Sequence, residues 1–63
     1  MEYPTLNEIR NQIDSGIKTT KEFVAIQKVL VEMYIYNILD AHSSMELLEA
    51  SIISFEKNGM YNI

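Results

Sequence analysis

The residue types that most often carry out catalysis are sparse in this sequence of 63 residues, which has one histidine and no cysteine. His42 stands beside Ser43 and Ser44, in a segment that we predict to be a turn just before a helix cap. Neighbours on one turn do not form a nucleophile–base–carboxylate triad, because those side chains must converge from different parts of the chain. The sequence therefore predicts no catalytic residue, and we expect a protein that is not an enzyme.

Two carboxylates, Glu46 and Glu49, are three residues apart, and carboxylate pairs on several helices can hold metal ions in a bundle. Such sites also need a Glu-x-x-His pair, which this sequence lacks. The two glycines, Gly16 and Gly59, are too far apart to form a glycine-rich phosphate loop. We therefore expect neither a metal ion nor a cofactor.

Four basic residues lie in or near the segment SGIKTT, namely Arg10, Lys18, Lys21 and Lys28. Two helices joined by this segment would have the order of a DNA-binding helix-turn-helix. The second of these helices begins TKEFVAIQK, whose apolar residues suit a core better than a DNA groove. The net charge of −4 also argues against nucleic acid as the main partner. DNA binding through these four residues is kept as an alternative.

Three Ser/Thr-x-x-Glu patterns indicate where helices begin. They join Thr5 to Glu8, Thr19 to Glu22 and Ser43 to Glu46, and each has the form of a capping box. The two glycines stand where a left-handed residue would end the first and third helices. These signals predict an all-α, single-domain protein (residues 1–63) with helices at about 5–15, 19–41 and 44–58 and frayed ends at 1–3 and 61–63.

The predicted long central helix, residues 19–41, has apolar side chains over an arc of roughly 200°. The first helix has few apolar residues to cover this arc, and a domain of this size builds only a marginal core. We therefore expect another protein to cover part of the arc. A two-fold homodimer forming a helical bundle is favoured, and a monomer with a different partner or with none is the alternative.

Six residues of that helix are candidates for the protein interface: Phe23, Gln27, Leu30, Tyr34, Tyr36 and Asn37. Tyr34 should lie mostly in the core, whereas Tyr36 borders the polar stripe and suits contact with a partner. Gln27 and Asn37 are polar residues within the apolar arc, which can fix the register of a helix pair. On this hypothesis Asn37→Leu raises stability and loosens the oligomeric state. The alternative is that either amide bonds to a backbone carbonyl.

The C-terminal half holds the excess of negative charge, and Glu46, Glu49 and Glu56 form a candidate face for a basic partner or a merely solvated surface. We expect a protein–protein interaction module acting as regulator, adaptor or stoichiometric inhibitor. In size and charge the chain is similar to small accessory proteins of phages and other mobile elements. A self-assembling structural subunit and an enzyme subunit are further alternatives. The sequence shows no signal peptide and no membrane span, so a cytoplasmic location is expected.

Overall fold

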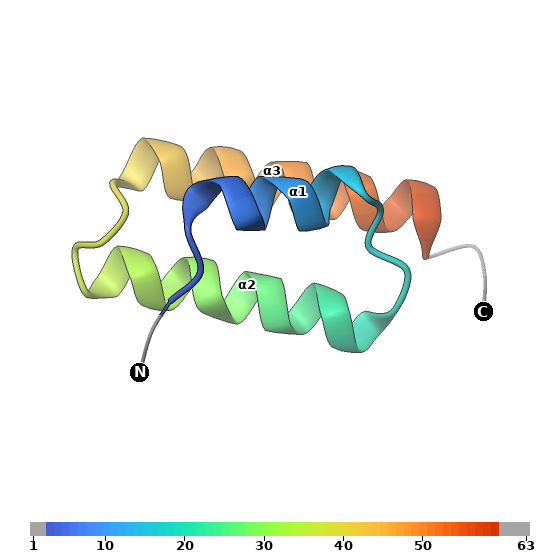
Figure 1. Ribbon diagram of the computed structural model, residues 1–63, viewed down its shortest axis with the longest axis horizontal. Coiled ribbons are helices and arrows are strands. Elements are labelled where there is room, and N and C mark those ends of the chain that lie inside the picture. The colour runs from blue at the N-terminus through green and yellow to red at the C-terminus, as the bar shows by residue number, and fades with distance from the viewer. Residues whose placement is uncertain (1–2, 60–63) are drawn as a thin grey trace.

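The computed structural model describes residues 3–59, which form three α-helices and, within that range, no strand. The helices are α1 (Leu6–Asp14), α2 (Thr20–Ile35) and α3 (Ala41–Asn58). Figure 1 shows α2 and α3 side by side and running in opposite directions, with α1 in front of α3. The predicted all-α fold is confirmed. Of the ends expected to fray, residues 1–2 and 61–63 lie outside the described range.

The starts of α1 and α2 are those predicted from the sequence. Thr5 Oγ1 accepts a hydrogen bond from the Glu8 N–H at 3.2 Å, and Glu8 Oε1 accepts one from the Thr5 N–H at 3.3 Å, which completes a capping box. At α2, Thr19 Oγ1 accepts from the Glu22 N–H at 3.1 Å. Both threonines have extended backbone and satisfy an N–H group that the helix leaves unpaired.

The predicted start of the third helix at Ser43 is wrong. The cap of α3 is Asp40, whose Oδ2 accepts from the Ser43 N–H at 3.2 Å. Aspartate caps helices as well as serine does, and α3 therefore begins at Ala41. His42, expected before the cap, lies instead in the first turn of α3.

The predicted long central helix is also wrong, because α2 ends at Ile35. Asn37 has a φ of +61°, the Ile38 N–H donates to the Met33 carbonyl at 2.8 Å, and the Asn37 N–H donates to the Tyr34 carbonyl at 3.1 Å. These bonds form a Schellman motif, in which a left-handed residue ends a helix. The longest helix is α3, with 18 residues, and α3 is the helix that packs against both of the others.

The core lies between the three helices and includes one residue from each connecting turn, Ile17 and Leu39. Its members are apolar side chains that water hardly reaches. They are Ile9, Ile13, Ile17, Ile26, Leu30, Met33, Leu39 and Leu47. Burial of these side chains supplies the main driving force for the fold.

Three serines of α3 are buried beside this core: Ser44, Ser51 and Ser54. The Ser44 hydroxyl lies 3.4 Å from the Leu30 carbonyl oxygen of α2, to which it donates. Every buried side-chain N or O atom in the described range has a hydrogen-bond partner. Because serine is small and bonds to backbone groups, α3 approaches its neighbours without burying an unpaired polar atom.

The two glycines have different roles. Gly16 has a φ of +98° and ends α1 as predicted, in the left-handed region that favours glycine. Gly59 ends α3, but its φ of −128° is not left-handed. It is needed for space instead, because a Cβ atom there would lie 2.7 Å from both the Lys18 carbonyl oxygen and the Phe55 ring.

Candidate protein-binding surface

Two of the six predicted interface residues are used inside the chain. Leu30 is fully buried in the core, with none of its surface exposed. Phe23 is half-buried, and its ring stacks on that of Phe55 with the ring centroids 4.7 Å apart. Leu30 therefore cannot meet a partner, and Phe23 joins α2 to α3 within one molecule.

Two amide side chains were expected to fix a helix pairing. That of Gln27 is hydrogen-bonded within the chain, and that of Asn37 lies beyond the end of the helix. Gln27 Nε2 donates to Ser51 Oγ at 2.9 Å, and the Ser51 hydroxyl donates to the Leu48 carbonyl at 2.7 Å. Asn37 is exposed in the turn that follows α2. The expected position of Asn37 within the apolar arc of a helix is wrong, because this residue terminates the helix.

The two tyrosines at the end of α2 are both exposed, Tyr34 by 48% and Tyr36 by 65%. The expected core position of Tyr34 is therefore wrong. The ring centroids of Tyr36 and Tyr3 are 6.4 Å apart. The Tyr3 hydroxyl donates to Glu32 Oε2 at 3.3 Å. Partial removal of water, and then the charge of Glu32, raise the pKa of Tyr3 above its ordinary value. Tyr3, which was expected to fray, thus packs on α2.

One side of the α2 and α3 pair exposes a set of large apolar side chains, hereafter the α2–α3 face. Its members are Val24, Val31, Tyr34 and Ile35 of α2 and Met45 and Ile52 of α3. Spacings of three, four and seven residues place each set on one side of its helix. The opposite side of α2 faces α1, because Ile26 and Val29 line a hollow there together with Ile9. The α2–α3 face therefore lies away from α1.

A hollow of about 230 Å³ runs between the two helices on this face. Its lining is Val31, Tyr34, Ala41, Ser44, Met45 and Leu48. A hollow of this size accepts large side chains, and contiguous apolar surface of this kind is typical of protein interaction sites. Except for Tyr34, the interface prediction omitted the members of the α2–α3 face. The seven-residue spacing of Val24 and Val31, repeated by Met45 and Ile52, was the available signal.

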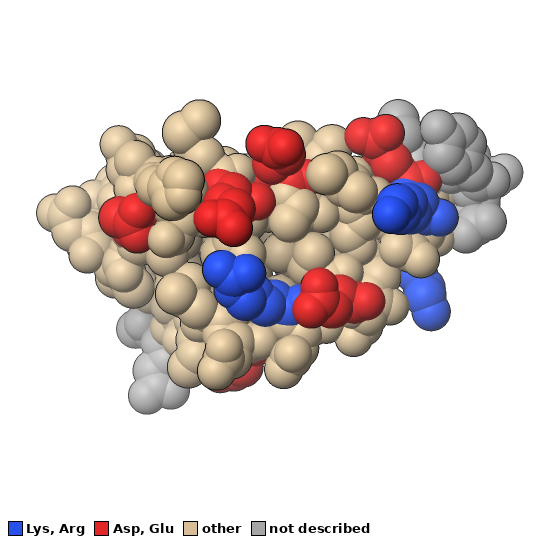
Figure 2. Space-filling view, turned by 90° about the horizontal axis from the view of Figure 1, so that it is seen from above, with Lys and Arg blue, Asp and Glu red and all other residues tan. Residues whose placement is uncertain are grey.

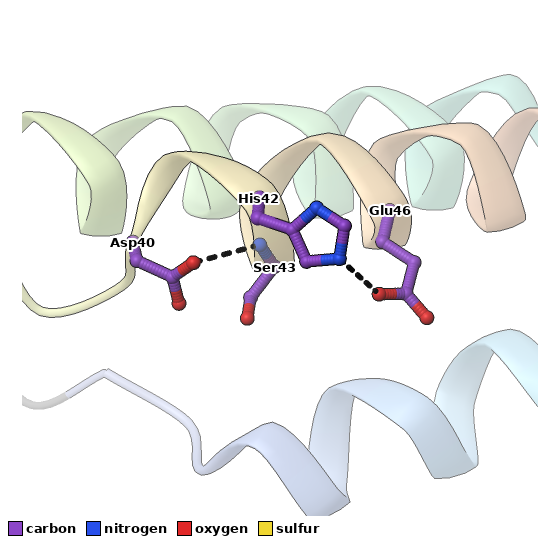
Figure 3. Close-up of polar contacts among 4 residues, drawn as sticks. All are labelled: Asp40, His42, Ser43 and Glu46. Carbon is purple, nitrogen blue, oxygen red and sulfur yellow. Dashed lines mark hydrogen bonds and ion pairs between the residues drawn. The ribbon is translucent and has the colours of Figure 1, made fainter.

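The three glutamates predicted to form an acidic face are all exposed. The view from above, onto α3 and the flank of α1, shows acidic side chains dispersed among uncharged ones, with basic side chains between them (Figure 2). Glu46 Oε2 lies 3.6 Å from His42 Nε2, with 58% and 89% of their side-chain surfaces exposed (Figure 3). Ion pairs this exposed contribute little stability.

The first turn of α3 gathers polar groups without forming a reactive site. Hydrogen bonds from the Ser43 hydroxyl and then from the Ser43 N–H hold the pKa of Asp40 below its ordinary value. In Figure 3 Asp40 and His42 are directed to different partners. Among residues 3–59 no three His, Asp or Glu side chains are grouped closely enough to hold a metal ion.

The four basic residues proposed for DNA are all exposed, on three different elements. Arg10 lies on α1, Lys18 in the following turn, and Lys21 and Lys28 on α2. The hollow of about 380 Å³ between α1 and α2 has Glu22 as its charged lining residue. The basic residues therefore do not line the hollow of the helix-turn-helix.

None of the helices within residues 3–59 is long and apolar enough to cross a bilayer. The largest apolar exposure in that range is on Met45, at 68%, on the α2–α3 face. No protein-family model, curated protein or solved structure matches the chain significantly.

Proposed function

We propose that this protein is a non-enzymatic protein–protein interaction module whose α2–α3 face binds a second copy of the chain. The observation that carries the proposal is the continuity of the exposed apolar surface on that face. Its six large apolar side chains are between 43% and 68% exposed. Single exposed apolar residues are ordinary on protein surfaces, but a contiguous patch with a hollow is typical of an interface.

The shape of the face suits a second copy because it offers both a protrusion and a hollow. Met45 is 68% exposed and also lines the hollow. In a two-fold dimer the same patch lies on both sides, so each hollow can receive a protruding side chain of the other copy. Methionine is unbranched and adapts to such a site. A regulatory, adaptor or inhibitory role would then belong to the dimer, through the outer surfaces that carry α1.

Adjacent isoleucines of α3 provide a matched pair of variants for testing this proposal. Ile52 lies on the α2–α3 face and is 44% exposed, while Ile53 is 48% exposed and points about 100° away around the helix. Sedimentation equilibrium of the wild type should show a dimer. Ile52→Glu should raise the dissociation constant at least about tenfold, because a carboxylate would be buried in an apolar interface.

Ile53→Glu introduces the same charge at nearly the same exposure and should leave the dimer intact. Circular dichroism of both variants would establish that the helices are retained. The proposal is wrong if the wild type is monomeric up to roughly 100 μM. It is also wrong if the two variants weaken association equally, because the contact would then not be on the α2–α3 face.

A further inference from the structure

Two lysines border the α2–α3 face along α2. Lys28 lies four residues after Val24 and seven before Ile35, so it neighbours both on the helix surface. Lys21 lies seven residues before Lys28 and continues the same edge. On the inner side of the apolar stripe, Tyr34 lines the hollow that α2 shares with α3. The two lysines are exposed and therefore form the outer edge of the face, on α2.

Two glutamates border the face in the same way along α3. Glu49 lies four residues after Met45, and Glu56 lies four residues after Ile52. Both glutamates are exposed. Leu48 occupies the inner side of this stripe, where it lines the hollow. The α2 edge of the face also carries Glu32, four residues after Lys28, which is half-buried and accepts a hydrogen bond from the Tyr3 hydroxyl. Its two lysines leave this edge net basic, whereas the α3 edge is acidic, and apolar side chains lie between the two edges.

The lysines and glutamates also lie at matching heights along the two helices. Gln27 Nε2 bonds to Ser51 Oγ at 2.9 Å, and the Ser44 hydroxyl bonds to the Leu30 carbonyl at 3.4 Å, so each of these two pairs lies at a similar height. Because α2 and α3 are antiparallel, each step forward on α2 is matched by a step back on α3. Lys28 therefore lies at the height of Glu49 to within about one helical turn of 5.4 Å.

A second comparison of heights comes from the stacked rings near the start of α2 and the end of α3. Phe23 and Phe55 lie level, with their ring centroids 4.7 Å apart. Lys21 lies two residues before Phe23, and Glu56 lies one residue after Phe55. Lys21 is therefore at the height of Glu56, again to within about one helical turn. The two lysines of the basic edge and the two glutamates of the acidic edge therefore lie at the same two heights along the helices.

We infer that the second copy docks with its two-fold axis parallel to α2 and α3, so that α2 of each copy packs on α3 of the other. This inference deepens the proposed self-association and depends on it. Rotation about such an axis keeps every residue at its height and brings the basic edge of one copy to the acidic edge of the other. Lys28 then faces Glu49 of the second copy, and Lys21 faces Glu56 of the second copy.

The other way of placing two apolar faces together has the axis perpendicular to the helices. That axis would set α2 on α2 and α3 on α3. The basic edges would then meet each other, as would the acidic edges, and like charges disfavour an interface. Opposite charges at matching heights therefore select the axis parallel to the helices and an antiparallel contact of α2 with α3.

Cysteine cross-linking distinguishes the two axes, because the natural sequence has no cysteine. Lys28→Cys and Glu49→Cys would be prepared as separate single variants and treated, alone and mixed, with a bismaleimide spanning roughly 10 Å, about the separation of packed helices. The mixture should give the covalent dimer, and either variant alone should not. Lys28→Cys mixed with Glu56→Cys is the matched control, because Glu56 lies about 10 Å further along α3.

Charge exchange tests the same geometry without cross-linking. Reversing Lys21 and Lys28 to glutamate, or Glu49 and Glu56 to lysine, should each raise the dimer dissociation constant roughly tenfold at low salt. All four changes together should restore it, because every pair is again of opposite sign. With the perpendicular axis, either reversal would leave as many like-charge pairs as the wild type has.

The outcomes separate this inference from the proposal on which it depends. Self-cross-linking of Lys28→Cys, with the dimer present in sedimentation, would overturn the parallel axis and leave self-association standing. Charge reversals that leave the dissociation constant unchanged would also overturn it. A wild type that is monomeric would overturn both, whereas restoration by the fourfold exchange supports both.

Discussion

The hydroxyl of Ser54 in α3 donates a hydrogen bond of 2.7 Å to the carbonyl oxygen of Ile13 in α1. The same oxygen of Ser54 accepts from the Ile17 N–H at 3.1 Å. The end of a helix leaves carbonyl groups without partners inside that helix. One buried side chain therefore satisfies a carbonyl of the last turn of α1 and an N–H of the next turn, and fixes both to α3.

Removing this hydroxyl should destabilise the fold. Ser54→Ala leaves the Ile17 N–H without its partner in a buried site and removes one of two donors to the Ile13 carbonyl, which keeps the Gly16 N–H at 3.1 Å. We expect the free energy of unfolding to fall by about 2 kcal/mol. Urea denaturation would measure the change. Asn7→Ala, at an exposed position of α1, is the control and should change stability by less than about 0.5 kcal/mol. Equal effects of the two variants would contradict the role given to Ser54.

The left-handed conformation of Asn37 leads to a prediction opposite to the one made from sequence. Asn37→Leu should lower the free energy of unfolding by about 1–2 kcal/mol, because a branched side chain is strained at a φ of +61°. Asn37→Gly should keep or raise stability, because glycine adopts this region freely. Thermal denaturation of the two variants tests the difference. A more stable leucine variant would mean that the residue is not left-handed in solution.

The Asp40 cap of α3 should make the stability of the fold depend on pH. The pKa of Asp40 is below its ordinary value of 3.8, because the Ser43 hydroxyl and N–H bond to the ionised carboxylate. A folded-state pKa below the unfolded one gives a contribution that is present above pH 3.8 and is lost as the pH falls through the folded value. Asp40→Asn keeps a cap that does not titrate.

We therefore expect the melting temperature of the wild type minus that of Asp40→Asn to be constant from about pH 5 to pH 7 and to fall in stronger acid. Circular dichroism melting from neutral pH into acid below the ordinary pKa of 3.8 provides the measurement. If this signed value instead rises as the pH falls, the carboxylate does not act as the cap.

Gly59 should not tolerate a methyl group, although its backbone conformation is open to other residues. Gly59→Ala should cost about 1–3 kcal/mol, because overpacking forces backbone or ring to move. In a Phe55→Leu background the cost should fall, because the clash with the ring is removed. It should not vanish, because the clash with the Lys18 carbonyl remains. Denaturant titration of the four proteins measures this coupling. If the free-energy costs of Gly59→Ala and Phe55→Leu simply add, the added methyl group does not clash with the Phe55 ring.

The fold class and two helix starts could be predicted because they depend on local signals. Thr5 and Thr19 each bond to a residue three positions on, and such contacts are visible in a short window of sequence. The boundary between α2 and α3 could not be predicted, because Asp40 and Ser43 are both good cap residues and Asn37 is the only residue near the end of α2 whose type suits a left-handed turn. Asparagine adopts the left-handed region less readily than glycine. A continuous apolar run therefore masked the turn.

The exposed apolar residues of α3 were not predicted, because the hydrophobic pattern of this helix is partly reversed. Ser51 is fully buried on its inward side, while Met45 and Ile52 point outward. Helical periodicity identifies an apolar stripe, but it does not say which neighbour covers that stripe. Only the arrangement of the helices shows that Leu30 faces the core and that Val24 and Val31 face away from α1.

The buried serines of α3 also bear on how stability varies with temperature. Hydration of apolar surface raises the heat capacity on unfolding by about 0.45 cal/K/mol per Å², whereas hydration of polar surface lowers it by about 0.26. A single molecule with hydroxyls inside and Met45 and Ile52 already in water should have a smaller heat-capacity change, and hence a shallower stability curve, than one with an all-apolar interior. Association through the α2–α3 face would remove those side chains from water, so the calorimetric heat-capacity change would rise with protein concentration.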